Sequence, residues 1–190
     1  LGGFTLTVNG DFLAAPNSAI NNGNINITSV NATISGAAIG ANINVVSQNI
    51  AIHGSVFNGT ATFQKTGPFP NISHGGNLFQ SDFSFTHSSS GPVLFADALP
   101  DTYNGTATFN NSGGGTIFIG INQFGATTSN NTFNSDAVFN NLGGGGLGLG
   151  IYIVGNGTQF NGNIRVSSTS PDGVHFGHLF FNGQSLHFGS

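Results

Sequence analysis

The side chains that could carry acid–base chemistry in this 190-residue chain are few. It has six Asp, no Glu and only two basic residues, Lys65 and Arg165. Polysaccharide lyases and hydrolases need clustered carboxylates as metal ligands or as an acid–base pair, usually beside a cation that stabilises developing charge. The chain also lacks Cys, which removes thiolate nucleophiles, disulfides and cysteine-based zinc or iron–sulfur sites.

Asp82 and Asp136 come nearest to a catalytic pair, because they occupy the same position of a repeated pattern. Thr106 holds that position in the copy between them, so the two carboxylates would lie two strand spacings apart, about 9.6 Å. That distance is too long for a shared metal and at the upper edge for an inverting pair of glycosidase carboxylates. We interpret both as solvated, outward-facing side chains.

The other ionisable residues have structural interpretations. Asp97 and Asp101 flank residues 98–100, a turn-like Ala-Leu-Pro sequence, and are expected to cap it. His175 and His178 are three residues apart on or near a predicted strand, where they would face opposite sides instead of converging on a metal. The sequence therefore predicts no catalytic residue, no metal site and no cofactor.

Composition also limits the partners. The net charge is −4, and no basic cluster is present to attract nucleic acid or an anionic membrane surface. No apolar run approaches the roughly 18 residues of a membrane-spanning helix. Hydrophobic residues make up 37% of the chain and include 19 Phe, which is enough to bury a core.

A repeated heptad indicates how that core is built. Its pattern is aromatic, Asn or Gln, small, polar, apolar, mostly polar, apolar, as in FNGTATF at 57–63 and YNGTATF at 103–109. Because alternate residues of a strand face opposite sides, the first, third, fifth and seventh positions are expected to face the core. The first and last positions predict a core ladder of Phe57, Phe79, Tyr103, Phe133, Phe160, Phe63, Phe85, Phe109, Phe139 and Val166. The second positions predict an amide ladder of Asn58, Gln80, Asn104, Asn134 and Asn161.

A second short strand follows four of these heptads, after a turn rich in Gly, Ser and Asn. Its middle residues are expected to point away from the core. They predict a contact stripe for sugars or neighbouring subunits, unless long loops cover it: Leu94, Phe118, Tyr152 and His175.

The repeat spacing indicates the fold. Residues 1–55 carry a shorter version of the repeat, and residues 56–190 carry the longer one, with 22, 24, 30 and 27 residues between the leading aromatics at 57, 79, 103, 133 and 160. Good helix formers are nearly absent. Two short strands per repeat predict an all-β, right-handed parallel β-solenoid of about eight irregular windings, with the two sections continuous. The alternative is an antiparallel β-sandwich, which gives no reason for one residue type to recur at the same point.

Residues 78–111 and the segment GTQFNGN at 157–163 resemble the tandem repeats of giant secreted surface proteins of Bacteroidota. That family includes large adhesins of gliding bacteria and other type IX secretion substrates, and the resemblance covers roughly residues 56–190. It implies a cell-surface location and no catalytic residues. The C-terminal sorting domain expected of such proteins is not in this chain.

We therefore expect a non-catalytic structural or adhesive section of a secreted cell-surface or filament-forming protein. Its expected partners are adjoining repeats, stacked copies or surface glycans. An ice-binding or carbohydrate-binding solenoid is the alternative, and a polysaccharide lyase or hydrolase is less favoured. Outward Thr pairs at 60/62 and 106/108 are typical of an ice-binding face, but Asp82 and Asp136 interrupt their periodicity.

Overall fold

The computed structural model describes residues 3–120, 130–143, 151–153, 157–170, 173–176, 179–181 and 186–189. Within these ranges the chain forms short strands, β1 to β23, and no helix. Val, Ile, Phe and Thr, which favour the pleated conformation, occupy the strands, and Gly, Asn and Ser occupy the corners between them.

The strands form three sheets. The ten-stranded sheet contains β1 (Thr5–Asn9), β2 (Phe12–Ala14), β4 (Asn24–Ser35), β6 (Asn42–His53), β8 (Ala61–Lys65), β11 (Phe83–His87), β14 (Ala107–Asn111), β17 (Ala137–Asn141), β20 (Ile164–Ser168) and β23 (Leu186–Gly189). The eight-stranded sheet contains β3 (Ala19–Ile20), β5 (Ala38–Ile39), β7 (Val56–Phe57), β10 (Leu78–Phe79), β13 (Thr102–Tyr103), β16 (Thr132–Phe133), β19 (Thr158–Phe160) and β22 (Leu179–Phe181). The five-stranded sheet contains β9 (Asn71–Ser73), β12 (Val93–Phe95), β15 (Ile117–Ile119), β18 (Ile151–Ile153) and β21 (Val174–Phe176).

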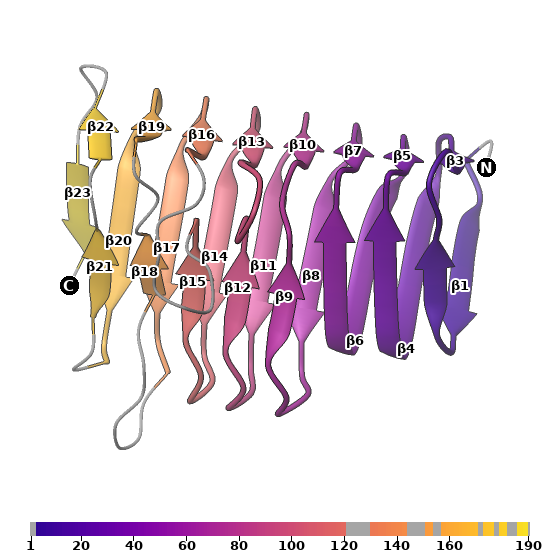
Figure 1. Cartoon of the computed structure of the whole chain (residues 1–190), viewed down its shortest axis with the longest axis horizontal. Helices are drawn as coiled ribbons and strands as arrows, with labels where there is room; N and C mark the ends of the chain where they lie inside the picture. The colour runs from indigo at the N-terminus through magenta and orange to yellow at the C-terminus, as the bar shows by residue number, and fades with distance from the viewer. Residues whose placement is uncertain are drawn as a thin grey trace.

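All the strand pairs are parallel, and each strand pairs with its equivalents in the windings before and after it. Figure 1 shows the windings side by side along the long axis, with β1 near one end and β21 near the other. The prediction of a parallel β-solenoid is therefore confirmed, and the antiparallel sandwich is excluded.

The number of full windings differs from the expected eight. Only the five windings that contribute to the five-stranded sheet have all three sides. In the earlier windings, β4 and β6 run as single twelve-residue strands past the corner at which later windings make a turn. The short N-terminal repeat leaves no residues for that turn, so the first windings are simpler than the later ones.

The core lies between the sheets. It is almost wholly aliphatic before Phe57 and mixes Phe and Tyr with Ala, Val and Ile from Phe57 onward. The first, fifth and seventh heptad positions are buried, as expected, but the third position is only half-buried. The expectation of one continuous strand was wrong here, because a corner separates β7 from β8 within the heptad. The aromatic residue and the two later core residues therefore enter the same interior from two different sheets.

A change of width occurs where the short windings meet the long ones. β8 pairs with β6 over residues 43–47, and β9 faces the rest of β6 through side chains. The amide of Asn71 accepts from the Ile50 N–H at 2.8 Å and donates to its carbonyl, and the Ser73 hydroxyl accepts from the Ile52 N–H at 3.2 Å. These contacts satisfy backbone groups that a wider winding would otherwise leave unpaired inside the protein.

Candidate functional site: side-chain columns and the outer face

The aromatic residues that open the heptads form one column through the molecule. Successive ring centroids are 4.9, 5.0, 4.7 and 4.8 Å apart, and neighbouring ring planes differ by only 3–10°. This is the arrangement that the sequence predicts, and the rings are fully buried: Phe57, Phe79, Tyr103, Phe133 and Phe160. The spacing matches the separation of neighbouring strands, so each ring stacks on the next without bending the backbone.

The residues that close the heptads also lie in register and are buried: Phe63, Phe85, Phe109, Phe139 and Val166. Phe109 and Phe139 stack with centroids 5.6 Å apart. Phe83 departs from the pattern, because the neighbouring windings have Ala at its position. Its ring wedges between the two columns, 4.5 Å from Phe79 and 5.3 Å from Phe109.

The predicted amide ladder lies at the surface. Asn104 donates to Gln80, Asn134 donates to Asn104, and Asn161 donates to Asn134, each at 2.7 Å. Asn58 occupies the same position one winding before Gln80 and is exposed. Asn104 and Asn134 both donate and accept along the axis, so the ladder holds corners of successive windings together.

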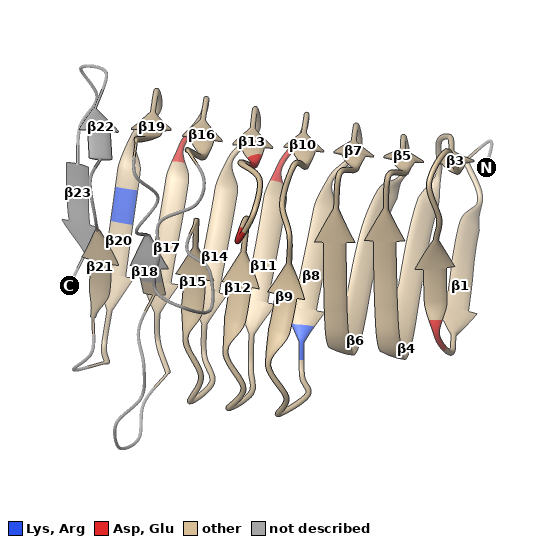
Figure 2. Ribbon diagram, viewed as in Figure 1, with Lys and Arg blue, Asp and Glu red and all other residues tan. Residues whose placement is uncertain are grey.

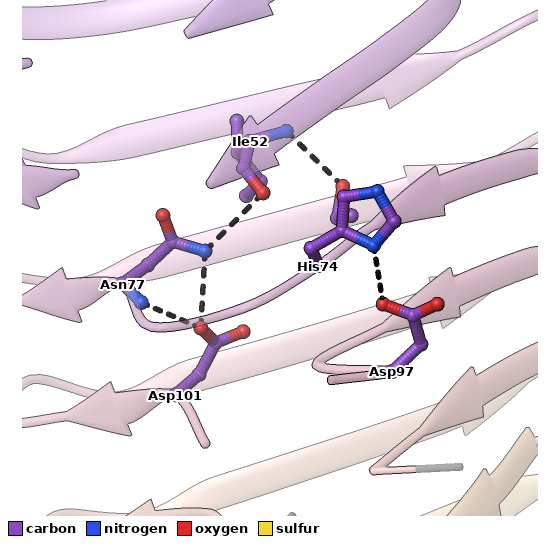
Figure 3. Close-up of polar contacts among 6 residues, drawn as sticks. Ile52, His74, Asn77, Asp97 and Asp101 are labelled. Atoms are coloured by element: carbon purple, nitrogen blue, oxygen red, sulfur yellow. Dashed lines mark hydrogen bonds and ion pairs between the residues drawn. The ribbon is translucent and has the colours of Figure 1, made fainter. Parts of the chain in front are cut away.

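A second polar ladder, which sequence reasoning missed, lies inside the protein two residues before each stacked ring: Ser55, Asn77, Asp101, Asn131 and Thr158, all of them buried. In three successive windings a side-chain oxygen accepts a backbone N–H of the winding before: Asn77 from Ser55 at 3.1 Å, Asp101 from Asn77 at 2.8 Å, and Asn131 from Asp101 at 2.7 Å. The Thr158 hydroxyl forms no such bond with a described residue. Figure 3 shows the part of this ladder around Asn77 and Asp101. Aligning the heptads two residues further back reveals the signal, a small polar residue in every copy.

Asp101 is the one carboxylate in this ladder, and its expected role as a simple turn cap was incomplete. Its side chain is fully buried, and burial raises its pKa to about 7 in spite of hydrogen bonds from the Asn77 backbone, the Asn77 amide and the Tyr103 hydroxyl. Tyr103 is the one tyrosine among the stacked rings, and its hydroxyl reaches Asp101 Oδ2 at 3.3 Å. Burial and the neighbouring carboxylate also raise the pKa of Tyr103.

Asp97 lies at the surface side of the same turn. Its carboxylate contacts Nδ1 of the exposed His74 at 2.8 Å (Figure 3). The backbone N–H groups of Ala98 and Leu99 donate to the His74 carbonyl, which ties this loop to the preceding winding. Asp97 and Asp101 therefore fasten one turn from two sides, Asp97 near the surface with its side chain 12% exposed and Asp101 in the core.

A third polar column closes the corners after the strands of the ten-stranded sheet. Its members are buried: Ser47, which lies inside β6 in register with Lys65, and Lys65, His87, Asn111 and Asn141, which end β8, β11, β14 and β17. Most of them donate to carbonyls of the adjoining turns, as Lys65 does to Gly67 and Asn111 to Gly115. Burial lowers the pKa of Lys65. Burial also lowers the pKa of His87, with a smaller contribution from the Lys65 charge.

The corner around Ser89 has the connectivity of a serine relay. The Asn111 amide nitrogen donates to Gly115 and Asn141, so its oxygen accepts from His87 Nδ1 at 3.1 Å. Nε2 of the neutral ring then accepts a hydrogen bond from the Ser89 hydroxyl, 3.1 Å away. The Lys65 ammonium nitrogen lies 3.2 Å from the same hydroxyl oxygen. Side chains at the equivalent position of other windings donate hydrogen bonds to carbonyls of the adjoining turns. We therefore interpret the His87 contacts as structural, with the imidazole taking the place of an amide at this corner.

The predicted contact stripe is only partly exposed. Leu94 is 5% exposed, against the expectation, and Phe118 is half-buried, while His175 is exposed. The side chain of Tyr152 lies outside the described residues. The burial of Leu94 agrees with the alternative that other parts of the chain cover the contact stripe. The stripe therefore does not form a continuous apolar surface from Leu94 onward.

Asp82 and Asp136 point outward on the ten-stranded sheet, two windings apart, as expected. Each carboxylate accepts a backbone N–H of the next winding, Asp82 from Thr106 at 2.9 Å and Asp136 from Asn163 at 3.1 Å. Arg165 lies 3.3 Å from Asp136. Figure 2 shows the two basic residues far apart along the described solenoid, on β8 and β20. Both carboxylates thus link successive windings.

The outer face of the N-terminal windings carries a shallow groove of about 220 Å³ over β1, β4, β6 and β8. The exposed side chains that line it are uncharged amides and hydroxyls: Thr5, Asn24, Asn26, Asn42, Asn44, Thr60 and Thr62. The buried Ile25 and Ile43 complete the lining. Asn42 donates to Asn24 at 3.2 Å and accepts from the backbone and hydroxyl of Thr60, both at 3.0 Å. One wall of the groove is therefore held in place by its own hydrogen bonds.

Comparisons with known proteins add no further constraint. No family model, curated protein or solved structure matches this chain. In the part of the chain that the structure describes, no group of three or more His, Cys, Asp or Glu side chains is placed to hold a metal ion. Among the same residues, no helix is long and apolar enough to cross a membrane.

Proposed function

We propose that this chain is a non-catalytic structural section of a secreted cell-surface or filament-forming protein, in which the solenoid acts as a stiff rod. The observation that carries the proposal is the unbroken column of five stacked rings inside three parallel sheets. Stretching or bending the rod would separate stacked rings, amides and backbone hydrogen bonds between successive windings. Such an arrangement supports a mechanical role.

The disposition of the ionisable side chains supports a non-catalytic role. The two outward carboxylates on the ten-stranded sheet, Asp82 and Asp136, hold backbone groups of the next winding. Asp101, Lys65 and His87 are buried in ladders that join windings. An acid–base pair would require two such groups to face one cleft.

The N-terminal end of the rod supports contact with a further winding. Leu6 and Val8 stand in register with Ile25 and Ile27, which are fully buried, yet Leu6 is 37% exposed. Nearby Phe4 is 75% exposed. An apolar end beside an unpaired strand edge favours the addition of another parallel strand. We propose that an adjoining repeat or a second copy covers this end.

Force spectroscopy tests the rod. The solenoid would be placed between marker domains and pulled through its two ends. We expect successive extension steps, because each winding is held mainly by its neighbours, and windings of 22–30 residues should each release roughly 75–105 Å of chain. Extension without force peaks would contradict the mechanical role.

Antibody labelling of intact source cells tests the surface location, and signal only after lysis would contradict it.

A second function, the binding of neutral glycans, is favoured by the uncharged groove over β1, β4, β6 and β8. Ice binding has less support, because the outward column that contains Thr62 continues with Ser84, Thr108, Val138 and Arg165. A flat and regular array of hydroxyls is therefore interrupted along the face.

A further inference from the structure

We infer that the groove over β1, β4, β6 and β8 is a binding site for a neutral, hydroxyl-rich oligosaccharide chain, with Asn26 and Asn44 as its principal contacts. The inference rests on the proposed surface function and gives it a ligand class. The groove crosses four windings, so it extends about 14 Å along the axis at three strand spacings. An elongated depression of this kind fits a linear chain lying along the rod.

The two walls of the groove differ in their available hydrogen bonds. Asn24, Asn42 and Thr60 bond to one another and are largely committed to the protein. Asn26, Asn44 and Thr62 stand in register as the other wall. Their side chains are exposed, and none of them forms a side-chain hydrogen bond with a described residue. Binding at this wall would not require any protein hydrogen bond to break.

The free wall has a definite chemical preference. Each Asn amide offers two donors and one acceptor oxygen, which match the paired donor and acceptor character of neighbouring sugar hydroxyls. No residue that lines the groove is charged, so phosphate, sulfate and uronic acid groups would find no counter-charge there. The protein's net charge of −4 further disfavours anionic chains. A neutral glycan is the ligand class that these features share.

The expected affinity is modest. Exposed neutral hydrogen bonds add little net free energy, because they replace hydrogen bonds to water, and the groove has no aromatic ring among its lining residues. A single groove should therefore bind with a dissociation constant of about 1 mM, or −4.1 kcal/mol. Several grooves on one rod or one cell surface would raise the effective affinity through avidity.

Titration with cellohexaose, chitohexaose and mannohexaose tests the site by NMR. We expect at least one of them to shift the side-chain amide signals of Asn26 and Asn44. The double variant Asn26→Ala/Asn44→Ala should weaken binding at least tenfold, because it removes the free wall and leaves the bonded wall intact. The matched control Ser84→Ala/Thr108→Ala changes the same column outside the groove and should bind like the wild type.

Each remaining outcome overturns the inference. It fails if none of the three hexasaccharides shifts these signals, or if binding survives in the Asn26/Asn44 variant. It fails equally if a polygalacturonate hexamer binds in preference to the neutral chains, or if the protein shows thermal hysteresis with no saccharide binding. The force experiment on the rod does not involve the groove, so its result separates failure of the glycan site from failure of the structural proposal.

Discussion

Asp101 places an ionisable group where a solenoid core has little means of solvating charge. A rise in pKa from 3.8 to about 7 corresponds to about 4 kcal/mol of preference for the neutral form in the folded state. Because the folded pKa is the higher one, this stabilisation is complete below pH 3.8. It is lost as the pH rises to about 7, above which the folded protein carries a buried carboxylate.

Asp101→Asn should therefore stabilise the protein at pH 8 and change little at pH 4. Asn keeps the oxygen that accepts from Asn77, and its amide nitrogen can donate to the Tyr103 hydroxyl. The gain at pH 8 should reach at most about 4 kcal/mol, measured by urea unfolding. The converse variant Asn131→Asp should lose more stability at pH 8 than at pH 4. Equal effects of Asp101→Asn at both pH values would show that the carboxyl is solvated.

His87 should give the opposite pH dependence. Its pKa is lowered, chiefly by burial, so the unfolded chain takes up a proton near pH 6.5 while the folded ring stays neutral. Stability from this site is present above about pH 6.5 and is lost as the pH falls toward the folded pKa. His87→Asn, which copies Asn111 and Asn141 of the same column, should compare more favourably with the wild type at pH 5 than at pH 7.5. Thermal unfolding at the two pH values measures the difference, and an identical difference at both would exclude the assignment.

The strands and corners depend on close approach between windings as much as on apolar burial. At Gly105, a Cβ would lie 2.4 Å from the Ser81 carbonyl carbon and 2.5 Å from the Asp82 nitrogen, both of them backbone atoms. Neither atom can move without shifting the preceding corner. Glycine at this third heptad position therefore preserves the distance between the two windings, whereas the alternation of the heptad predicted only that the position faces the core.

Gly105→Ala should destabilise the protein by about 1–3 kcal/mol, the usual cost of overpacking. Gly114→Ala is the matched control, because a Cβ there meets nothing within 4 Å. Urea midpoints at constant slope would report the two effects. Equal midpoints for the two variants would show that the corner relaxes freely and that the spacing of windings is not fixed at this point.

The sequence predicted those elements in which one residue type recurs in register. Stacked aromatics and surface amides repeat their chemistry from winding to winding, so simple alignment places them correctly. The buried polar ladder was not predicted, because the residue type changes from Ser55 to Asn77, Asp101 and Thr158. Each of them nevertheless places a side-chain oxygen at the same position of its winding. The burial of Leu94 was not predicted either, because the alternation of the strand places its middle residue on the outer face.

The whole molecule is a one-dimensional stack of windings, and this determines how far the destabilisation caused by one substitution extends along the rod. Each winding contacts mainly the windings before and after it, so stability is a sum of local terms and of couplings between neighbours. Phe79 lies in the middle of the aromatic column, stacked between Phe57 and Tyr103 and also contacting Phe83. A cavity at that point removes coupling between the N-terminal and C-terminal parts of the rod.

Phe79→Ala should cost about 3–5 kcal/mol and should make the two parts unfold separately. Amide hydrogen exchange would then accelerate most in β8, β11 and β14, which surround the cavity, and less in β4 at a distance of several windings. Leu13→Ala is the control, since that side chain is 70% exposed and its loss should leave exchange nearly unchanged. A uniform acceleration of hydrogen exchange from β4 to β17 would instead mean that the rod unfolds as a single cooperative unit. Resistance to force would then belong to the whole stack and not to its separate windings.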